Sequence, residues 1–161
     1  MNPGNRNHRL RLSWRGSQGL TLVELMIVVA ITGVMAAIAV PAFDGFISRN
    51  RITATTNDLV GALNLARSEA ASRGESVDVV PLKGDWAKGV SLKANGASIH
   101  RASTPEGVEF SGQAFTFRAV GEVQDGSGKC LEIIDGNGSG RHSVTVSPAG
   151  QVRSKDAGCG P

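Results

Sequence analysis

One acidic residue stands alone inside a long apolar run near the N-terminus. Residues 20–40 read LTLVELMIVVAITGVMAAIAV, and Glu24 is their only ionisable residue. A charge at the centre of a membrane-spanning helix costs about 2.5–3.5 kcal/mol on insertion scales. The run contains no basic residue, so we expect the countercharge to come from another subunit or from a free amine made by cutting the chain nearby. The other interpretation is an acid tolerated close to the lipid headgroups.

The two cysteines, Cys130 and Cys159, are the other residues whose type suggests chemistry. They form no CxxC pattern, and a metal site would need more ligands at closer spacing. In an oxidising compartment two lone cysteines form one disulfide, and the alternative is two free thiols. A disulfide would close a loop of about 30 residues, which the loop-entropy model values at roughly 3–4 kcal/mol.

The sequence contains none of the common catalytic motifs HExxH, GxSxG or GxxxxGKS/T. Residues 126–129 (GSGK) lack the spacing of a phosphate-binding loop. Residues 135–140 (DGNGSG) copy the first half of a calcium-binding EF-hand loop, but its twelfth position is Val146 instead of glutamate. We interpret this segment as a β-turn loop, with weak calcium binding as the alternative. We expect no enzymatic activity, no cofactor and no metal site.

The apolar run has the length of a membrane-spanning helix. Its 21 residues would span roughly 31 Å at 1.5 Å per residue. Four arginines and no acidic residue precede it: Arg6, Arg9, Arg11 and Arg15. Basic residues favour the cytoplasmic side, so we expect a single-pass inner-membrane protein whose C-terminal head lies in the periplasm. Without residues 1–19, 13 basic and 14 acidic side chains remain. The formal net charge of +3 for the whole chain therefore comes from residues 1–19 and does not by itself indicate nucleic-acid binding.

The letters GLTLVE at 19–24, behind a basic leader and ahead of an apolar helix, resemble the processing site of type IV prepilins and type II secretion pseudopilins. The resemblance implies that residues 1–19 are a leader, and that prepilin peptidase cuts after Gly19 and methylates the new amine of Leu20. The family usually has phenylalanine at the position of Leu20. The resemblance also implies that Glu24 pairs with the terminal amine of a neighbouring subunit, which would offset the cost of two lone charges in an apolar filament core.

An ordinary secretory signal is the alternative interpretation of the N-terminus. The small residues at 37–39 (AIA) fit a signal-peptidase site, and a cut after Ala39 would release a soluble periplasmic protein that begins at Val40. The charge of Glu24, the length of the apolar run and the helical pattern beyond the supposed cut all argue against it.

That helical pattern predicts one helix from residue 20 to residue 73, roughly 80 Å long. Apolar residues recur on one stripe at steps of seven, four, three and four: Ile52, Leu59, Leu63, Ala66 and Ala70. We expect residues 20–40 to be the transmembrane part, 41–74 to be the periplasmic half, and Gly74 to end the helix in a left-handed conformation. Gly33 and Pro41 fall where pilin helices carry helix-weakening residues, and we expect a kink at Pro41.

Residues 75–161 have the composition of a small β-rich head. Residues 74–161 contain 15 glycines in 88 positions, about 17% against a usual ~7%. Short runs of β-forming residues alternate with turn residues, which predicts seven or eight antiparallel strands. The expected strands cover 77–82, 89–92, 98–101, 108–110, 114–120, 130–134, 143–147 and 151–153.

This half resembles the GspH/FimT group of minor pilins and pseudopilins, which includes FimU. Four short motifs carry the resemblance in order: ARSEA at 66–70, DWAKG at 85–89, FTF at 115–117 with Gly121, and SPAGQVR at 147–153. The implied fold is α+β, a long N-terminal helix packed on a small antiparallel head of two sheets. The implied partners are prepilin peptidase, other pilin or pseudopilin subunits and an inner-membrane assembly platform.

Two functions follow from the resemblance. The first is structural: a minor subunit near the filament tip that helps to start assembly of a type IV pilus or a type II secretion pseudopilus. The second is DNA capture for natural transformation, in which a Gly-Arg-x-Arg motif near the C-terminus is implicated in some FimT-like proteins. This chain has GQVR at 150–153. A basic patch for DNA would combine Arg153 and Lys155 with Arg141 and Lys129, and the alternative is ordinary surface charge.

Overall fold

The computed structural model describes residues 19–136, 138 and 140–160, without the side chains of residues 40–42 and 44. Apart from Gly19, the leader expected at residues 1–19 therefore lies outside the described residues. The chain divides into two compact units, of which the first ends at Pro41 and the second begins at Ala42.

The first unit contains the beginning of helix α1 (Leu22–Arg73). Thr21 caps the helix, because the backbone N–H of Glu24 donates to Thr21 Oγ1 at 3.1 Å and is thereby satisfied. The window Leu22–Ala39 has a mean hydropathy of 2.5 and is long enough to cross a membrane. The backbones of Gly33 and Pro41 are helical. The side chain of Pro41 lies outside the described residues, and the kink there stays a prediction.

In the second unit, α1 supplies one side of the hydrophobic core. The five residues of the predicted stripe are all buried: Ile52, Leu59, Leu63, Ala66 and Ala70. Gly74 follows the helix with φ +67°, and the N–H of Glu75 donates to the carbonyl of Ala70 at 3.2 Å. This is a left-handed C-cap that satisfies a carbonyl of the last turn. The predictions of the apolar stripe and of the glycine end are confirmed.

The strands of the described residues form two antiparallel sheets, A in the order β3-β2-β1-β5 and B in the order β4-β6-β7-β8. Sheet A consists of β1 (Val77–Pro81), β2 (Gly89–Ala94), β3 (Ala97–Ser103) and β5 (Phe115–Phe117). Sheet B consists of β4 (Val108–Ser111), β6 (Lys129–Asp135), β7 (Arg141–Val146) and β8 (Val152–Lys155). Two short 3-10 helices, η1 (Leu82–Gly84) and η2 (Trp86–Lys88), join β1 to β2.

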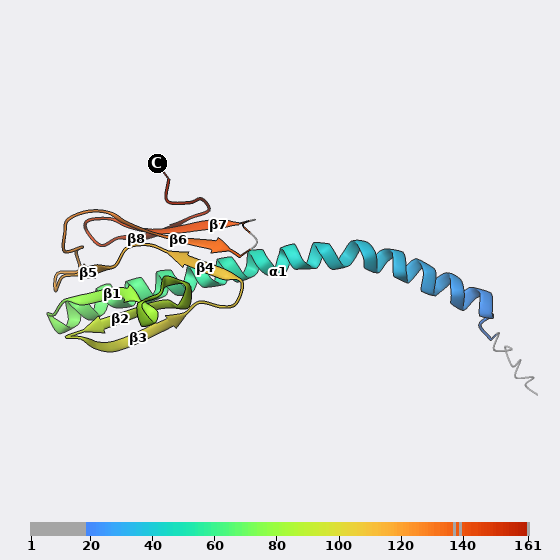
Figure 1. Ribbon diagram of the computed structural model, residues 1–161, viewed down its shortest axis with the longest axis horizontal. Helices are drawn as coiled ribbons and strands as arrows, with labels where there is room; N and C mark the ends of the chain where they lie inside the picture. The colour runs from blue at the N-terminus through green and yellow to red at the C-terminus, as the bar shows by residue number, and fades with distance from the viewer. Residues whose placement is uncertain (1–18, 137, 139, 161) are drawn as a thin grey trace, which may run out of the picture. The chain divides into compact units, whose positions relative to one another are not determined.

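Both sheets contribute alternate apolar residues to one core with α1. Val77 and Val79 of β1 and Leu131 and Ile133 of β6 are fully buried, and the polar residues between them are less so. This period of two is what a half-buried antiparallel strand requires. Figure 1 shows the part of α1 in the second unit running beside the strands of both sheets. The predicted α+β fold, a helix packed on a two-sheet head, is confirmed.

The strand predicted at 114–120 is shorter in the structure, because β5 ends at Phe117. The chain turns immediately afterwards. The N–H of Gly121 donates to the carbonyl of Arg118 at 2.7 Å, and the N–H of Arg118 donates to the carbonyl of Glu122 at 2.8 Å. Gly121 has φ +79°, which glycine adopts without the strain of a side chain. The turn brings Val123 back to form an isolated β-bridge with Phe117.

Candidate assembly segment and basic surface of the head

The bond between Gly19 and Leu20 lies just before α1. Gly19, Leu20 and Thr21 are not helical, and all three are exposed. A Cβ built on Gly19 meets no atom within 4 Å. Nothing in the described chain therefore requires a glycine at this position. A requirement for glycine would have to come from an enzyme that binds the segment.

The first unit exposes apolar side chains along its whole described length. Leu20 is 75% exposed and Ile38 is 72% exposed, and the large apolar residues between them are all more than half exposed. An uninterrupted apolar surface of this kind needs a covering of lipid or of other apolar helices. Thr32 fits such surroundings, because its Oγ1 donates to the carbonyl of Val28 at 2.8 Å and leaves no free donor.

Glu24 lies in the first turn of this apolar helix. Its backbone N–H is held by Thr21, and its side chain is exposed. A carboxylate in the first turn interacts favourably with the helix dipole, but the effect is only about 0.3–1 kcal/mol. Residues 19–41 contain no basic side chain, so this segment itself supplies no countercharge for Glu24. The Thr-x-x-Glu spacing at 21–24 is a helix-start signal in the sequence, and our sequence reasoning did not use it.

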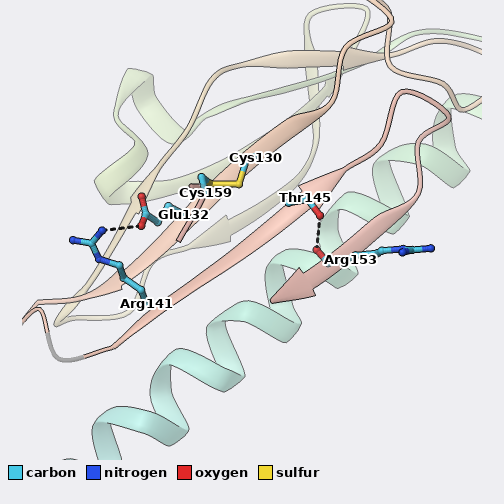
Figure 2. Close-up of a disulfide and its surroundings, with 6 residues drawn as sticks. All are labelled: Cys130, Glu132, Arg141, Thr145, Arg153 and Cys159. Atoms are coloured by element: carbon cyan, nitrogen blue, oxygen red, sulfur yellow. Dashed lines mark hydrogen bonds and ion pairs between the residues drawn. A yellow bond between two sulfur atoms is a disulfide. The ribbon is translucent and has the colours of Figure 1, made fainter. Parts of the chain in front are cut away.

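The disulfide joins Cys130 of β6 to Cys159 of the C-terminal tail. The two Cα atoms are 5.9 Å apart, and the residues are separated by 29 positions in sequence. Figure 2 shows the bond between Cys130 and Cys159 close to Glu132 of β6. The bond therefore holds residues 156–160 against sheet B, and the predicted pairing of the two cysteines is confirmed.

Two of the four basic residues considered for DNA binding are paired with acids. The Nη1 atom of Arg141 lies 3.4 Å from Oε1 of Glu132. Lys129 forms an ion pair with Asp125 and donates to Ser127 Oγ at 2.8 Å. Their charges are therefore partly neutralised within the head.

The other two, Arg153 and Lys155, are exposed on strand β8, which lies at the edge of sheet B. They are two positions apart and so project from the same face of the strand. The Oγ1 of Thr145 donates to the carbonyl of Arg153 at 3.4 Å, and the side chain of Arg153 points away from Arg141 (Figure 2). The structure thus brings Arg153 and Lys155 together but does not add Arg141 to them.

Three of the four motifs of the head meet at one point of the structure. Arg67, from the motif at the helix end, donates from Nε to the carbonyl of Gly121 at 3.2 Å. A Cβ on Gly150 would lie 1.9 Å from that same carbonyl oxygen and 3.1 Å from Arg67 Nε. The N–H of Val123 donates to the carbonyl of Pro148 at 2.9 Å and joins the two loops. These motif residues therefore join the helix to two loops of the head. Their order along the chain did not reveal this role.

The loop at 135–140 is built as a turn. The N–H of Gly138 donates to the carbonyl of Asp135 at 2.6 Å, and the N–H of Asp135 donates to the carbonyl of Gly140 at 3.0 Å. The carboxylate of Asp135 is buried and accepts a hydrogen bond from Ser48 at 2.7 Å. In the described part of the chain, no three His, Cys, Asp or Glu residues come together as metal ligands. Asn137 and Ser139 lie outside the described residues.

Comparison with known proteins agrees with both halves of this description. Residues 55–150 match the family model described as type II transport protein GspH, and residues 14–40 match the prokaryotic N-terminal methylation motif. Fimbrial protein Q of Moraxella bovis is 33% identical over 98 residues. The match spans 61% of this chain and 61% of that protein.

Two solved structures share the fold. The type IV minor pilin FimU of Pseudomonas aeruginosa superposes with a TM-score of 0.59 at 24% identity, over 68% of this chain and 92% of FimU. The minor pseudopilin EpsH from the type 2 secretion system of Vibrio cholerae superposes with a TM-score of 0.53 at 14% identity, over 66% of this chain and 97% of EpsH. The chain therefore belongs to the GspH family of type IV pilins and pseudopilins, which are structural proteins, and it carries their N-terminal methylation motif.

Proposed function

We propose that this chain is a minor pilin that is cut after Gly19, methylated on Leu20 and built into a filament near its tip, where it helps to start assembly. Before assembly it is anchored in the inner membrane with its head in the periplasm. The observation that carries the proposal is the exposed apolar helix at residues 22–39, which has one acid in its first turn and a glycine just before its start. Only a membrane or a bundle of similar helices can cover such a segment.

The position of the two candidate cleavage bonds supports processing after Gly19. Proteases bind their substrates in extended form, and Gly19 and Leu20 are exposed and outside the helix. The bond after Ala39 lies inside α1, and its hydrogen-bonded backbone would have to unwind before it could be cut. These placements argue for the prepilin interpretation over a secretory signal.

Replacing Gly19 tests the processing step. We expect Gly19→Val to accumulate as a precursor that keeps residues 1–19, because the larger side chain blocks the peptidase and not the fold. Gly33→Ala is the matched control, since a Cβ at Gly33 also meets no atom within 4 Å. Mass spectrometry of the N-terminal peptide identifies the first residue of the chain and its methylation. A wild-type chain that begins at Val40, or that begins at Leu20 without a methyl group, contradicts the proposal.

Replacing Glu24 tests the assembly step. We expect Glu24→Ala to be processed and inserted in the membrane but to be lost from filaments, because the neighbouring terminal amine then has no countercharge. The Thr21 cap uses the backbone N–H of Glu24 and survives the substitution. Glu24→Gln keeps the shape and removes only the charge. If Glu24→Gln enters sheared filaments at the wild-type level, measured by immunoblot, charge pairing is not the reason for the acid.

We favour a type IV pilus over a type II secretion pseudopilus as the filament. Support comes from the fimbrial relative and from the higher identity to FimU than to EpsH. Deletion of the gene in its own host separates the two. We expect a loss of surface pili with normal secretion of exoproteins, and the reverse result would assign the chain to the secretion system.

DNA capture is the second candidate, and the exposed pair Arg153 and Lys155 on β8 is the observation that favours it. Two exposed cations give a weak site, since each phosphate contact adds a slope of only about −0.9 to the salt dependence of binding. If the pair binds DNA, Arg153→Ala weakens gel retardation at low salt and reduces that slope, whereas Arg118→Ala, at a turn outside β8, does not. Unchanged retardation in Arg153→Ala removes this candidate.

A further inference from the structure

Sheet A carries a hollow of about 400 Å³ on the surface between η1 and strands β2 and β3. Six of its lining residues are polar or glycine: Lys83, Gly84, Ser91, Lys93, Ser98 and Arg101. Three of them are cations from three different elements. None belongs to the assembly segment or to the basic residues of β8, so this hollow is separate from the sites described above.

The strand register explains why these side chains share one face. Ser91 lies opposite Arg101, and Lys93 lies opposite Ser98. Ser98 and Arg101 are three positions apart, which in a regular strand would place them on opposite faces. The pairing of β2 with β3 shifts register between Leu92 and Lys93, so that β3 has one residue more than β2 at this point. The extra residue brings Ser98 and Arg101 to the same face of the sheet.

Hydrogen bonds hold the floor of the hollow. The Oγ atoms of Ser91 and Ser98 are 3.3 Å apart, and Arg101 donates from Nε to Ser98 Oγ at 3.0 Å. This bond orients the guanidinium group and leaves its two Nη groups available for a ligand. One serine hydroxyl donates to the other, and the hydroxyl hydrogen that remains is a further donor beside it.

Lys83 reaches the hollow through an unusual backbone conformation. It has φ +54° and ψ +28°, in the left-handed region, and is followed by Gly84 at φ +79°. A residue with a side chain is strained there, whereas glycine is not. A lysine at such a position is a reason to look for a function of its side chain.

None of the three cations of the hollow forms an ion pair within the described residues. The ion pairs among the described residues involve other basic side chains: Arg73, Lys88, Lys129, Arg141 and His142. Two acids lie near these cations in sequence or register, and neither forms an ion pair with them within the described residues. Asp78 lies opposite Lys93 but accepts from Thr116 Oγ1 at 2.8 Å, and Asp85 caps η2 and pairs with Lys88 at 3.4 Å.

We propose that this hollow binds a phosphate group. Three positive charges and one free hydroxyl donor around one centre match an anion with about two charges and several acceptor oxygens. A carboxylate brings one charge and two oxygens and would leave part of the set unpaired. The phosphate can be inorganic or part of a phosphodiester, since both present the same oxygens. The site does not depend on the filament proposal, because all of its residues lie in the head.

Binding is tested on the full mature protein in detergent micelles, titrated with sodium phosphate against sodium chloride at equal ionic strength. The amide NMR signals of Ser91 and Arg101 report the site, and calorimetry gives the affinity. We expect phosphate but not chloride to shift these signals. Arg101→Gln removes a charged hydrogen-bond donor and should weaken binding about tenfold. Arg118→Gln, at an exposed turn outside the hollow, is the matched control and should change the affinity less than about twofold.

Lys83→Gly separates binding from folding. Glycine relieves the left-handed strain, so the variant should unfold at the same or a higher temperature while losing phosphate affinity. A short single-stranded oligonucleotide is titrated in parallel. Binding of inorganic phosphate points to a free phosphate, and binding of the oligonucleotide alone points to a phosphodiester. Either supports the site if Arg101→Gln weakens it. The proposal is overturned if neither ligand produces a response or if Arg101→Gln binds phosphate with the wild-type affinity. It is also overturned if a glutamate-rich peptide binds more tightly than phosphate.

Discussion

Gly150 offers a direct test of how tightly the loops of the head are joined. It has φ +76°, and a Cβ there would lie 1.9 Å from the carbonyl oxygen of Gly121. Atoms cannot approach so closely, and the obstacle is backbone, not a side chain that can rotate away. Gly150→Ala must therefore push the loop at 147–151 away from the turn at 118–121. That movement would also disturb the hydrogen bond from Arg67 to Gly121.

The expected cost has two parts. A side chain in the left-handed conformation costs roughly 1–2 kcal/mol. Loss of a partly buried hydrogen bond from a charged donor costs about 1.5–3 kcal/mol. We therefore expect Gly150→Ala to lower the free energy of unfolding by about 2.5–5 kcal/mol. Gly74→Ala is the matched control, because Gly74 has φ +67° but a Cβ there meets no atom within 4 Å. It should lose only the conformational part.

The assay is urea unfolding of the mature protein followed by tryptophan fluorescence. Trp86 is the only tryptophan after residue 19 and packs against the core of the head, so its emission reports the unfolding of this unit. The difference between the two variants isolates the contact with Gly121 from backbone strain. If Gly150→Ala is no more destabilising than Gly74→Ala, the junction of Arg67, Gly121 and Gly150 yields without cost and our reasoning is wrong.

Two further predictions concern the surface of the head. Reduction of the Cys130–Cys159 disulfide should lower the unfolding free energy by roughly 3–4 kcal/mol in the loop-entropy model. The same urea titration, with and without reductant, measures this change. An unchanged urea midpoint would show that the tail is held by other contacts. The Lys129 ammonium, and then the Ser127 donors, lower the pKa of Asp125 to about 2 from 3.8. The carboxylate therefore favours the folded state above pH 3.8 and loses this contribution as the pH falls through 2. NMR titration of its carboxyl carbon checks this, and Lys129→Gln should return the pKa toward 3.8.

Local patterns carried much of what the sequence predicted correctly. The stripe from Ile52 to Ala70 and the end at Gly74 follow from the geometry of one helix, which depends on residues only three or four positions apart. The apolar run around Glu24 is defined by composition alone. The composition also left one possible pair for a disulfide, because the chain has two cysteines.

Strand boundaries and partners were harder to predict, because they depend on residues far apart in the chain. β1 pairs with β5 across forty positions (Val77 with Phe117), and no local pattern specifies that choice. The sequence predicted a strand at 114–120, three residues beyond Phe117, because the run is rich in strand-forming residues. In the folded chain, the turn that ends at Gly121 stops it and places the carbonyl of Gly121 against Arg67.

The sequence by itself determined that this chain has an apolar helix with one acid, a glycine before it and a β-rich head, since composition and short periodicities are properties of neighbouring residues. The tertiary structure alone decided which charges are neutralised and which are free. Arg141 of β7 forms an ion pair with Glu132 of β6. Lys83, Lys93 and Arg101 line one hollow, because a register shift in the pairing of β2 with β3 brings Arg101 to the face of sheet A that carries Ser98. Charge pairing depends on distances of a few ångströms between separate strands, and only the folded register sets those distances.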